Sequence, residues 1–244
     1  KELSETCVFA ASARLAHAHY REEYPLQYLK DLWAALDLGS LEGIVLRLAS
    51  VFLCLTIHES CHGLAAYALG DPTAKRAHRL SLNPLRHIDW IGFVMMIVAG
   101  FGWAKPVPVN PNYFKKPKEG MAVTALAGPA SNFLLALLLL LIARLVYARA
   151  LVTGALPQTL FSFLVNTACL SVGLGLFNLV PVPPLDGSKV VAVLLPDRAY
   201  NWLMRYEQLG MVLLVVIISV GVGSNALNAA IDWVFGLFCR IVGF

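Results

Sequence analysis

The feature that most constrains this chain is a set of apolar runs long enough to cross a lipid bilayer. The clearest run covers residues 121–147, and from Leu134 to Ile142 it is almost entirely leucine. A hydrocarbon core about 30 Å thick needs about 20 residues of helix, because every backbone N–H and C=O inside it must be bonded within the protein. Only 14% of the residues are charged, against about 25% in soluble domains. We therefore predict an all-α polytopic membrane protein.

Other apolar runs set the number of membrane spans. They cover 44–69, 160–180 and about 209–224, and the last could continue through Asn225 and Asn228 to Phe244. Residues 91–104 and 189–195 are apolar but short, so we expect about four to six transmembrane helices. Because 91–104 is also rich in glycine, we predict that it forms a re-entrant or β-hairpin-like segment near the cytoplasmic side.

Residues 1–40 differ from the rest of the chain in carrying mixed charge. Leu26, Leu29 and Trp33 recur there at helical spacing, which is typical of an amphipathic helix at a membrane surface. We predict an N-terminal interfacial segment at 1–40, followed by a single membrane-embedded domain at 41–244.

Basic residues indicate the orientation in the bilayer. Eight lysines and arginines lie between Gly70 and Gly120, whereas the connection after the leucine-rich run offers only Arg144 and Arg149. Because cytoplasmic loops are enriched in basic residues, we expect residues 70–120 in the cytoplasm. Basic and aromatic residues do not alternate in a nucleic-acid-binding pattern, so we expect no nucleic acid partner.

The run at 44–69 contains the motif His58-Glu59-Ser60-Cys61-His62. On a helix the two histidines share a face, one turn apart, so both imidazoles can bind one zinc ion while Glu59 activates its water. Ionisable groups inside an apolar span cost several kcal/mol unless they are paired or bind a metal. The motif therefore predicts a catalytic zinc site.

Such a site needs a third protein ligand. Asp186 is one candidate, because it follows prolines that interrupt an apolar run and could face a cavity. His87 is the other candidate, although a histidine in a polar, basic loop needs no metal. An Asp-Gly turn at the membrane surface is also an alternative for Asp186.

The combination of H-E-x-x-H with N-x-x-P-x-x-P-L-D-G, which runs from Asn178 to Gly187, resembles the site-2 protease family. These proteins are intramembrane zinc metalloproteases. The resemblance covers most of residues 44–190 and is to the short bacterial and archaeal type, without a PDZ or nucleotide-sensing domain. Gly70-Asp-Pro-Thr-Ala, Trp103-Ala-Lys-Pro-Val-Pro-Val-Asn and Ala127-Gly-Pro-Ala-Ser-Asn also match.

The resemblance implies a role for each matching residue. It implies that Zn²⁺ is bound by two imidazoles and a carboxylate: His58, His62 and Asp186. Glu59 would be the general base. Asn178 would stabilise the reacting carbonyl, although a helix-end asparagine can equally satisfy local backbone groups. Further residues are expected to pack the helices or support the site: Gly128, Pro129, Asn132 and His87.

The implied activity is hydrolysis of a peptide bond in or near a transmembrane segment of a membrane-protein substrate, as in regulated intramembrane proteolysis. A helical substrate must unwind before its carbonyls are accessible. An extended proline-rich segment could pair with it by β-strand addition, although a plain surface connection is an equal alternative. The segment comprises Lys105, Pro106, Val107, Pro108 and Val109.

Two other classes of protein are alternatives. A metal-ion transporter or an inactive scaffold could use the same histidines, but neither needs Glu59 as a base. A membrane desaturase usually needs about eight histidines, and the chain has 6. We therefore expect a multi-pass enzyme of a bacterial or archaeal cell membrane, with its active site nearer the cytoplasm.

Overall fold

The computed structural model describes residues 41–90, 92, 105–206, 210, 214, 216 and 223–244. The predictions for residues 1–40, for the 91–104 segment and for most of the 209–224 run lie outside these residues. The domain boundary expected near residue 40 therefore stays a prediction.

Four helices in the described part are long and apolar enough to cross a membrane. They are α3 (Leu41–Ala68), α6 (Pro117–Thr153), α7 (Gln158–Asn178) and α11 (Ser224–Val242). The first three coincide with predicted apolar runs, and the described residues contain no strand. The prediction of an all-α polytopic membrane protein is confirmed.

The stretch through Asn225 and Asn228 forms the separate helix α11. It starts after Gly223, whose positive φ of 84° is a conformation that glycine adopts without steric cost. The residues after this glycine are thus helical up to Val242, close to the predicted limit at Phe244.

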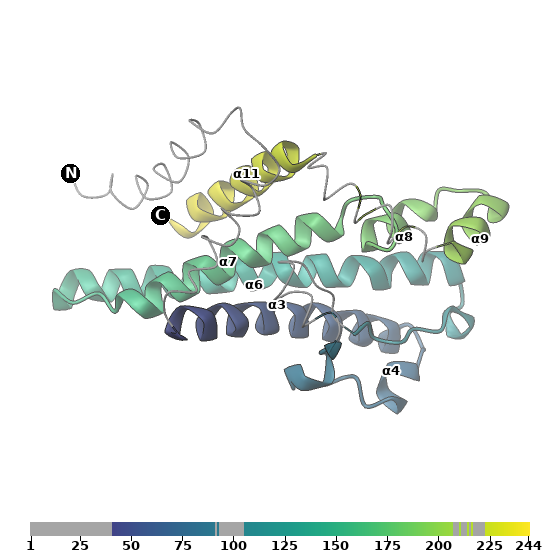
Figure 1. Ribbon diagram of the computed structural model, residues 1–244, viewed down its shortest axis with the longest axis horizontal. Coiled ribbons are helices and arrows are strands. Elements are labelled where there is room, and N and C mark those ends of the chain that lie inside the picture. Colours follow the sequence, from purple (N-terminus) through teal and green to yellow (C-terminus); the bar gives the residue numbers. More distant parts are fainter. Residues whose placement is uncertain are drawn as a thin grey trace. The chain divides into compact units, whose positions relative to one another are not determined.

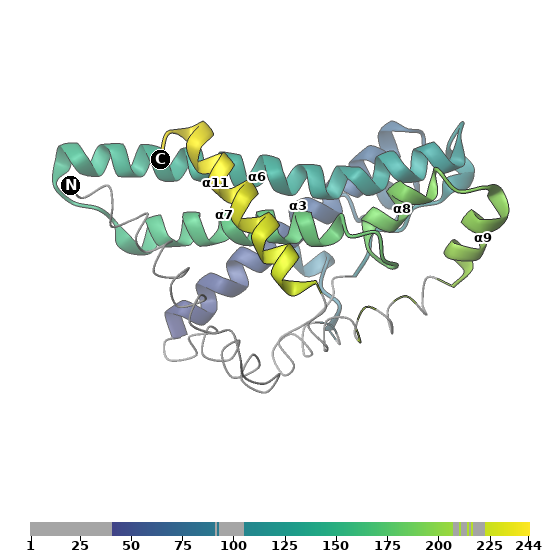
Figure 2. The ribbon, with the colours of Figure 1, turned by 90° about the horizontal axis from the view of Figure 1, so that it is seen from above.

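Helices α3, α6 and α7 lie side by side and contact one another (Figure 1). Helix α6 starts at Pro117 and ends before Gly154, which has a φ of 72°, so proline and glycine stand at the ends where helices favour them. The short connection from Gly154 to Pro157 makes α6 and α7 antiparallel neighbours. Helix α11 crosses both of them (Figure 2).

The core between these helices combines apolar and small polar side chains. Leu140 of α6 and Val172 of α7 are fully buried. The hydroxyls of Ser50 and Thr167 lie 2.6 Å apart, and Ser171 donates to the backbone oxygen of Asn132 at 2.8 Å. Lipid tails are as apolar as leucine, so hydrogen bonds and close packing hold membrane helices together. These contacts fix α3 and α6 against α7.

Two short helices follow α7. They are α8 (Asp186–Ala192) and α9 (Asp197–Arg205). With only 7 residues, α8 is too short to cross a bilayer, so the ambiguous stretch at 189–195 is not a span. Lys118, at the start of α6, pairs with Asp197 and donates to the Leu195 carbonyl at 3.0 Å. The turn between α8 and α9 is thereby fastened to α6.

The described part of the connection between α3 and α6 includes three short helical elements and a non-helical segment. The elements are α4 (Thr73–Arg76), η1 (Pro84–Arg86) and η2 (Pro111–Tyr113). Residues 105–110, which directly precede η2, are non-helical. This connection packs against the end of α3 that carries the histidine motif.

Candidate metal centre

Two helices bring three potential metal ligands together. His58 and His62 lie one turn apart on α3, and Asp186 is the first residue of α8. The Nε2 atoms of His58 and His62 are 2.9 Å apart, and each lies 3.1 Å from Oδ2 of Asp186. All three residues are buried. Ligand atoms on a tetrahedral zinc ion stand about 3.3 Å apart, so this slightly smaller triangle fits one face of a zinc tetrahedron.

The other ring nitrogen of His62 has a backbone partner. Its Nδ1 lies 2.7 Å from the carbonyl oxygen of Thr124 on α6. A carbonyl only accepts hydrogen bonds, so Nδ1 carries a proton, and in the neutral ring the lone pair is then on Nε2. That is the tautomer that a metal ligand needs, and a partner of this kind also fixes the ring orientation.

His58 is oriented by Asn132 of α6. The side-chain amide nitrogen of Asn132 lies 3.0 Å from Nδ1 of His58, while its oxygen, Oδ1, is buried and has no hydrogen-bond partner. A bound metal would take the Nε2 lone pair and move the His58 proton to Nδ1. Turning over the amide would then let Oδ1 accept this proton. The unpaired oxygen therefore fits a metal at Nε2.

Asp186 is held in its ionised form. Burial alone would raise the pKa of this carboxyl, but the hydrogen bonds from His58 and His62, reinforced by their charge, bring the pKa below its usual range. Only 8% of the residue is exposed. A carboxylate must be deprotonated to bind a metal, so Asp186 is prepared for that role.

Gly128 gives the two imidazoles their space. A β-carbon at this position would lie 2.4 Å from Cε1 of His62 and 2.6 Å from Cε1 of His58. We expected Gly128 to allow close packing of helices. In the structure, the groups that pack against Gly128 are the two imidazole rings. The next residue, Pro129, is buried inside α6 and has no N–H to offer the Ala125 carbonyl, so this turn lacks one helical hydrogen bond.

Comparison with known proteins identifies the family. Residues 47–221 match the family described as Peptidase family M50. The chain belongs to this family. The prediction of a site-2-protease-like metalloendopeptidase in a membrane is thereby confirmed.

Relatives support this assignment. A Bacillus subtilis (strain 168) protein named "Putative zinc metalloprotease YwhC" is 36% identical over 79% of this chain and 90% of its own length. A Mycolicibacterium smegmatis protein named "Putative zinc metalloprotease Rip2" is 26% identical over 83% of this chain and 79% of its own length. A Mycobacterium tuberculosis (strain H37Rv) protein of the same name is 25% identical over 79% and 74%. No solved structure matches the chain.

Glu59 of this M50 chain contacts the segment at 105–109. Its Oε2 accepts a hydrogen bond of 3.0 Å from the backbone N–H of Val107. Glu59 and the segment Lys105–Val109 are both part of the predicted mechanism, but no sequence pattern predicted that they are in contact. Their contact joins residues 48 positions apart, which only the path of the chain can determine.

Two other predicted site residues of the M50 chain have local partners. Nε2 of His87 lies 2.7 Å from the Ser81 carbonyl oxygen, and the ring is not part of the ligand group. The Asn178 side chain donates to the Leu174 carbonyl of its own helix at 2.9 Å. The structure therefore groups Asp186, and not His87, with the two histidines. The expected role of Asn178 toward a carbonyl stays a prediction.

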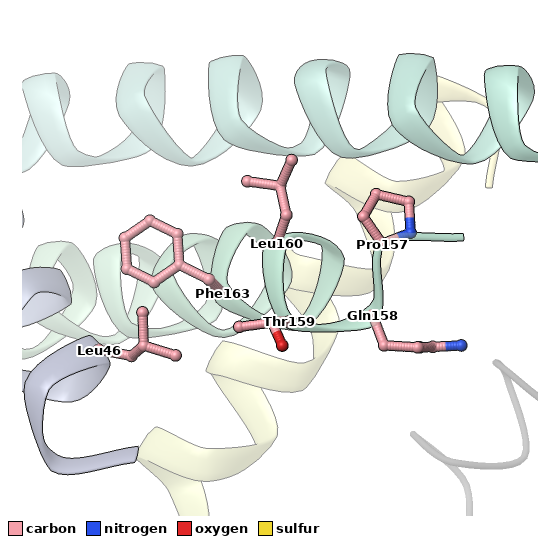
Figure 3. A pocket seen from close by; sticks show the side chains of 6 residues that line it. All are labelled: Leu46, Pro157, Gln158, Thr159, Leu160 and Phe163. Atoms are coloured by element: carbon pink, nitrogen blue, oxygen red, sulfur yellow. The ribbon is translucent and has the colours of Figure 1, made fainter. Parts of the chain in front are cut away.

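A pocket in the described part of the M50 chain lies elsewhere. It has a volume of about 420 Å³ and is lined mainly by apolar side chains (Figure 3): Leu46, Pro157, Gln158, Thr159, Leu160 and Phe163. Leu46 precedes His58 on α3 by 12 residues, or about 18 Å at 1.5 Å per residue. The pocket is therefore not part of the candidate metal centre.

Proposed function

We propose that this M50 chain is a zinc-dependent intramembrane endopeptidase that hydrolyses a peptide bond in or near a transmembrane segment of a membrane-protein substrate, in regulated intramembrane proteolysis. The observation that carries the proposal is the triangle of His58, His62 and Asp186 beside Glu59, on a helix long and apolar enough to cross a membrane. The names of the relatives, which call them zinc metalloproteases, support the choice of metal.

The three ligands would hold one Zn²⁺ and leave a fourth position for water. When bound there, zinc supplies a water whose pKa is lowered to about 7 and polarises the scissile carbonyl. Asn132 and the Thr124 carbonyl hold the two imidazoles with Nε2 toward the site. Gly128 keeps α6 close without filling the space of the rings.

Glu59 is the general base of the proposed reaction. It follows His58 directly, so its side chain points about 100° away from that ligand around the helix axis. Its carboxylate accepts a proton from the attacking water and passes it to the leaving amine. Unlike His58 and His62, Glu59 is only partly buried, so water can reach its carboxylate.

The expected substrate-pairing segment has few N–H groups to offer. Pro106 and Pro108 have none, Lys105 donates to the His87 carbonyl at 2.9 Å, and Val107 donates to Glu59. Substrate pairing here would depend on Val109 and on backbone carbonyls. We retain β-strand addition as part of the proposal in this restricted form.

The basic residues support an orientation for the enzyme. Lys75 and Arg76 follow the end of α3, and Lys116 and Lys118 stand at the start of α6. His62 is only 6 residues from the end of α3 at Ala68. By the positive-inside rule, we propose that the metal centre lies nearer the cytoplasmic face. The named relatives come from Bacillus and mycobacteria, so we place the enzyme in a bacterial or archaeal cell membrane.

The test is to reconstitute the wild-type protein and Glu59→Gln in liposomes with a panel of single-span substrates. We expect both proteins to bind about one Zn²⁺ and only the wild type to cleave. A chelator should stop cleavage and added Zn²⁺ should restore it. If both proteins bind zinc and neither cleaves any substrate, the protease proposal fails. Zinc flux across the same liposomes would then favour a transporter, and its absence a scaffold.

A further inference from the structure

We propose that residues 105–110, the strap, position the carboxylate of Glu59, and that Arg79 and Asp71 are positioning residues that hold the strap in place. This inference rests on the proposed role of Glu59 as general base. It assigns a role to two buried charged residues that belong neither to the ligand triangle nor to any predicted site.

The strap presents one backbone donor to Glu59. The N–H of Val107 donates to Oε2 at 3.0 Å. Pro106 and Pro108 on either side have no N–H and have restricted φ angles, so Val107 is the only donor between residues 106 and 108. A hydrogen bond from a fixed N–H to a carboxylate is stronger than a neutral one. It occupies Oε2 and leaves Oε1 for the proton of the water.

Arg79 holds the first end of the strap. Its guanidinium is buried, with 9% of the residue exposed, and it donates to the carbonyls of Lys105 at 2.5 Å and Pro106 at 3.3 Å. No carboxylate pairs with Arg79 among the described ion pairs. Burying the charge of Arg79 costs free energy. Because this buried guanidinium is bonded to two strap carbonyls, its burial indicates that the strap has to be held in this position.

His87 adds to the first end. Its carbonyl accepts the N–H of Lys105 at 2.9 Å, and its buried ring lies 2.7 Å from the Ser81 carbonyl. That carbonyl also accepts the hydroxyl of Ser60, which is the residue after Glu59, at 3.1 Å. The strap and the histidine motif are thus connected through the same loop.

Asp71 holds the second end of the strap. It is fully buried, and its Oδ2 accepts the N–H of Asn110 at 2.6 Å. Its Oδ1 accepts both the N–H of Thr73, at 2.9 Å, and the Thr73 hydroxyl. Because Asp71 lies only three residues after α3 ends, the strap is fastened to the helix that carries Glu59.

Packing of the Val107 side chain holds the middle of the strap against α3. The Val107 side chain is buried, with 8% of the residue exposed. A β-carbon at Gly63 of α3 would lie 3.2 Å from Cγ1 of Val107 and 2.5 Å from Cδ2 of Leu80. Glycine at this position, directly after His62, lets Val107 approach the helix closely. Both ends and the middle of the strap therefore determine where the Val107 N–H lies.

Hydrogen exchange tests the contact without any protease activity. Within the chain, the segment 105–109 carries amide hydrogens only at Lys105, Val107 and Val109, because the other two residues are prolines. We expect Glu59→Ala to accelerate the exchange of one amide by about tenfold or more, and Arg79→Gln to accelerate exchange of the segment as a whole. Unchanged exchange in Glu59→Ala would overturn the inference, even if the wild type is a protease.

A backbone substitution tests the consequence for catalysis. Replacing the Val107 amide by an ester removes the N–H and keeps the side chain. We expect kcat to fall about tenfold to a hundredfold, with KM and zinc content unchanged. The comparison variant, Val107→Ala, keeps the N–H and loses part of the packing, so it should lower kcat less than the ester does. Full kcat in the ester variant, or the same loss in both variants, would overturn the proposal.

Arg79 is tested by conservative rescue. Arg79→Gln should lower kcat with little change in KM, whereas Arg79→Lys keeps the charge and should recover part of the loss. A purely structural role would lower the melting temperature of both variants and leave the kcat of the folded fraction unchanged, and this result would contradict the inference. If Arg79→Gln fails to fold, the ester variant and the exchange experiment still decide.

Discussion

The side-chain amide of Asn132 on α6 lies 3.0 Å from Nδ1 of His58 on α3, and its buried oxygen has no partner. As oriented, Asn132 donates to Nδ1, so the His58 proton is on Nε2, against Asp186. Metal binding reverses this arrangement, because Nε2 must then offer its lone pair. Asn132 thus has a hydrogen-bonding role for either tautomer of His58, and it should influence metal affinity.

Asn132→Leu is predicted to weaken zinc binding about tenfold to a hundredfold, the usual effect of losing such a partner. Asn132→Asp can accept the Nδ1 proton and should retain most of the affinity. Competition with a chromogenic chelator measures both values. Ser131→Ala is the matched control, because the Ser131 hydroxyl donates only to the Gly128 carbonyl of its own helix, at 2.6 Å. Equal affinities of the Leu and Asp variants would contradict this role.

Gly128→Ala is predicted to remove zinc and lower the melting temperature, because the new methyl group would overlap both imidazole rings. Gly173→Ala on α7 is the control, since a β-carbon there would meet Cδ1 of Ile231 at an ordinary 3.4 Å. Metal analysis and thermal unfolding of the two purified variants distinguish the positions. Full zinc content in Gly128→Ala would show that α6 can move away from the rings.

Asp186→Ala is predicted to lower zinc affinity at least about a hundredfold, because it leaves two protein ligands where catalytic zinc normally has three. His87→Ala should keep the zinc, since the ring contacts Ser81 and not the ligand group. Zinc stoichiometry after dialysis checks both. Full stoichiometry in Asp186→Ala together with loss in His87→Ala would transfer the third ligand to His87.

Thr167→Val is predicted to destabilise the helix bundle by about 0.6 kcal/mol, a typical value for a hydrogen bond between membrane helices. Its hydroxyl is fully buried and lies 2.6 Å from that of Ser50. Thr56→Val is the matched change, because the Thr56 hydroxyl is buried without a partner. Replacing an unsatisfied hydroxyl by a methyl group should be neutral or stabilising. Unfolding in mixed detergent micelles measures both, and equal losses would contradict this account.

Much of the fold follows from local patterns in the sequence. A run such as 121–147 must be helical in a bilayer, whatever it contacts, because its backbone groups find no other partners there. The spacing of His58 and His62 places both imidazoles on one face of that helix for the same local reason. Asp186 was a candidate because it follows a proline-rich interruption, but spacing alone left His87 as an alternative.

The contacts that make the site specific depend on residues far apart in the chain. Gly128 reads as a helix-packing residue, and only the position of α6 shows that it clears space for two imidazoles. The same holds for the Thr124 carbonyl on His62 and for the Val107 N–H on Glu59. No periodicity encodes which carbonyl or N–H meets a given side chain, because that depends on how the helices cross.

The sequence by itself determined that this chain is a helical membrane protein with a histidine motif in one span, and its motifs indicated the site-2 protease family. Tertiary structure brought Asp186, and not His87, next to the two histidines, and it decided which groups contact each imidazole and Glu59. The physical reason is the separation along the chain of the residues that interact. Helix formation in lipid and ligand spacing within one turn are local properties, whereas the triangle joins positions 128 residues apart and exists only after the helices pack.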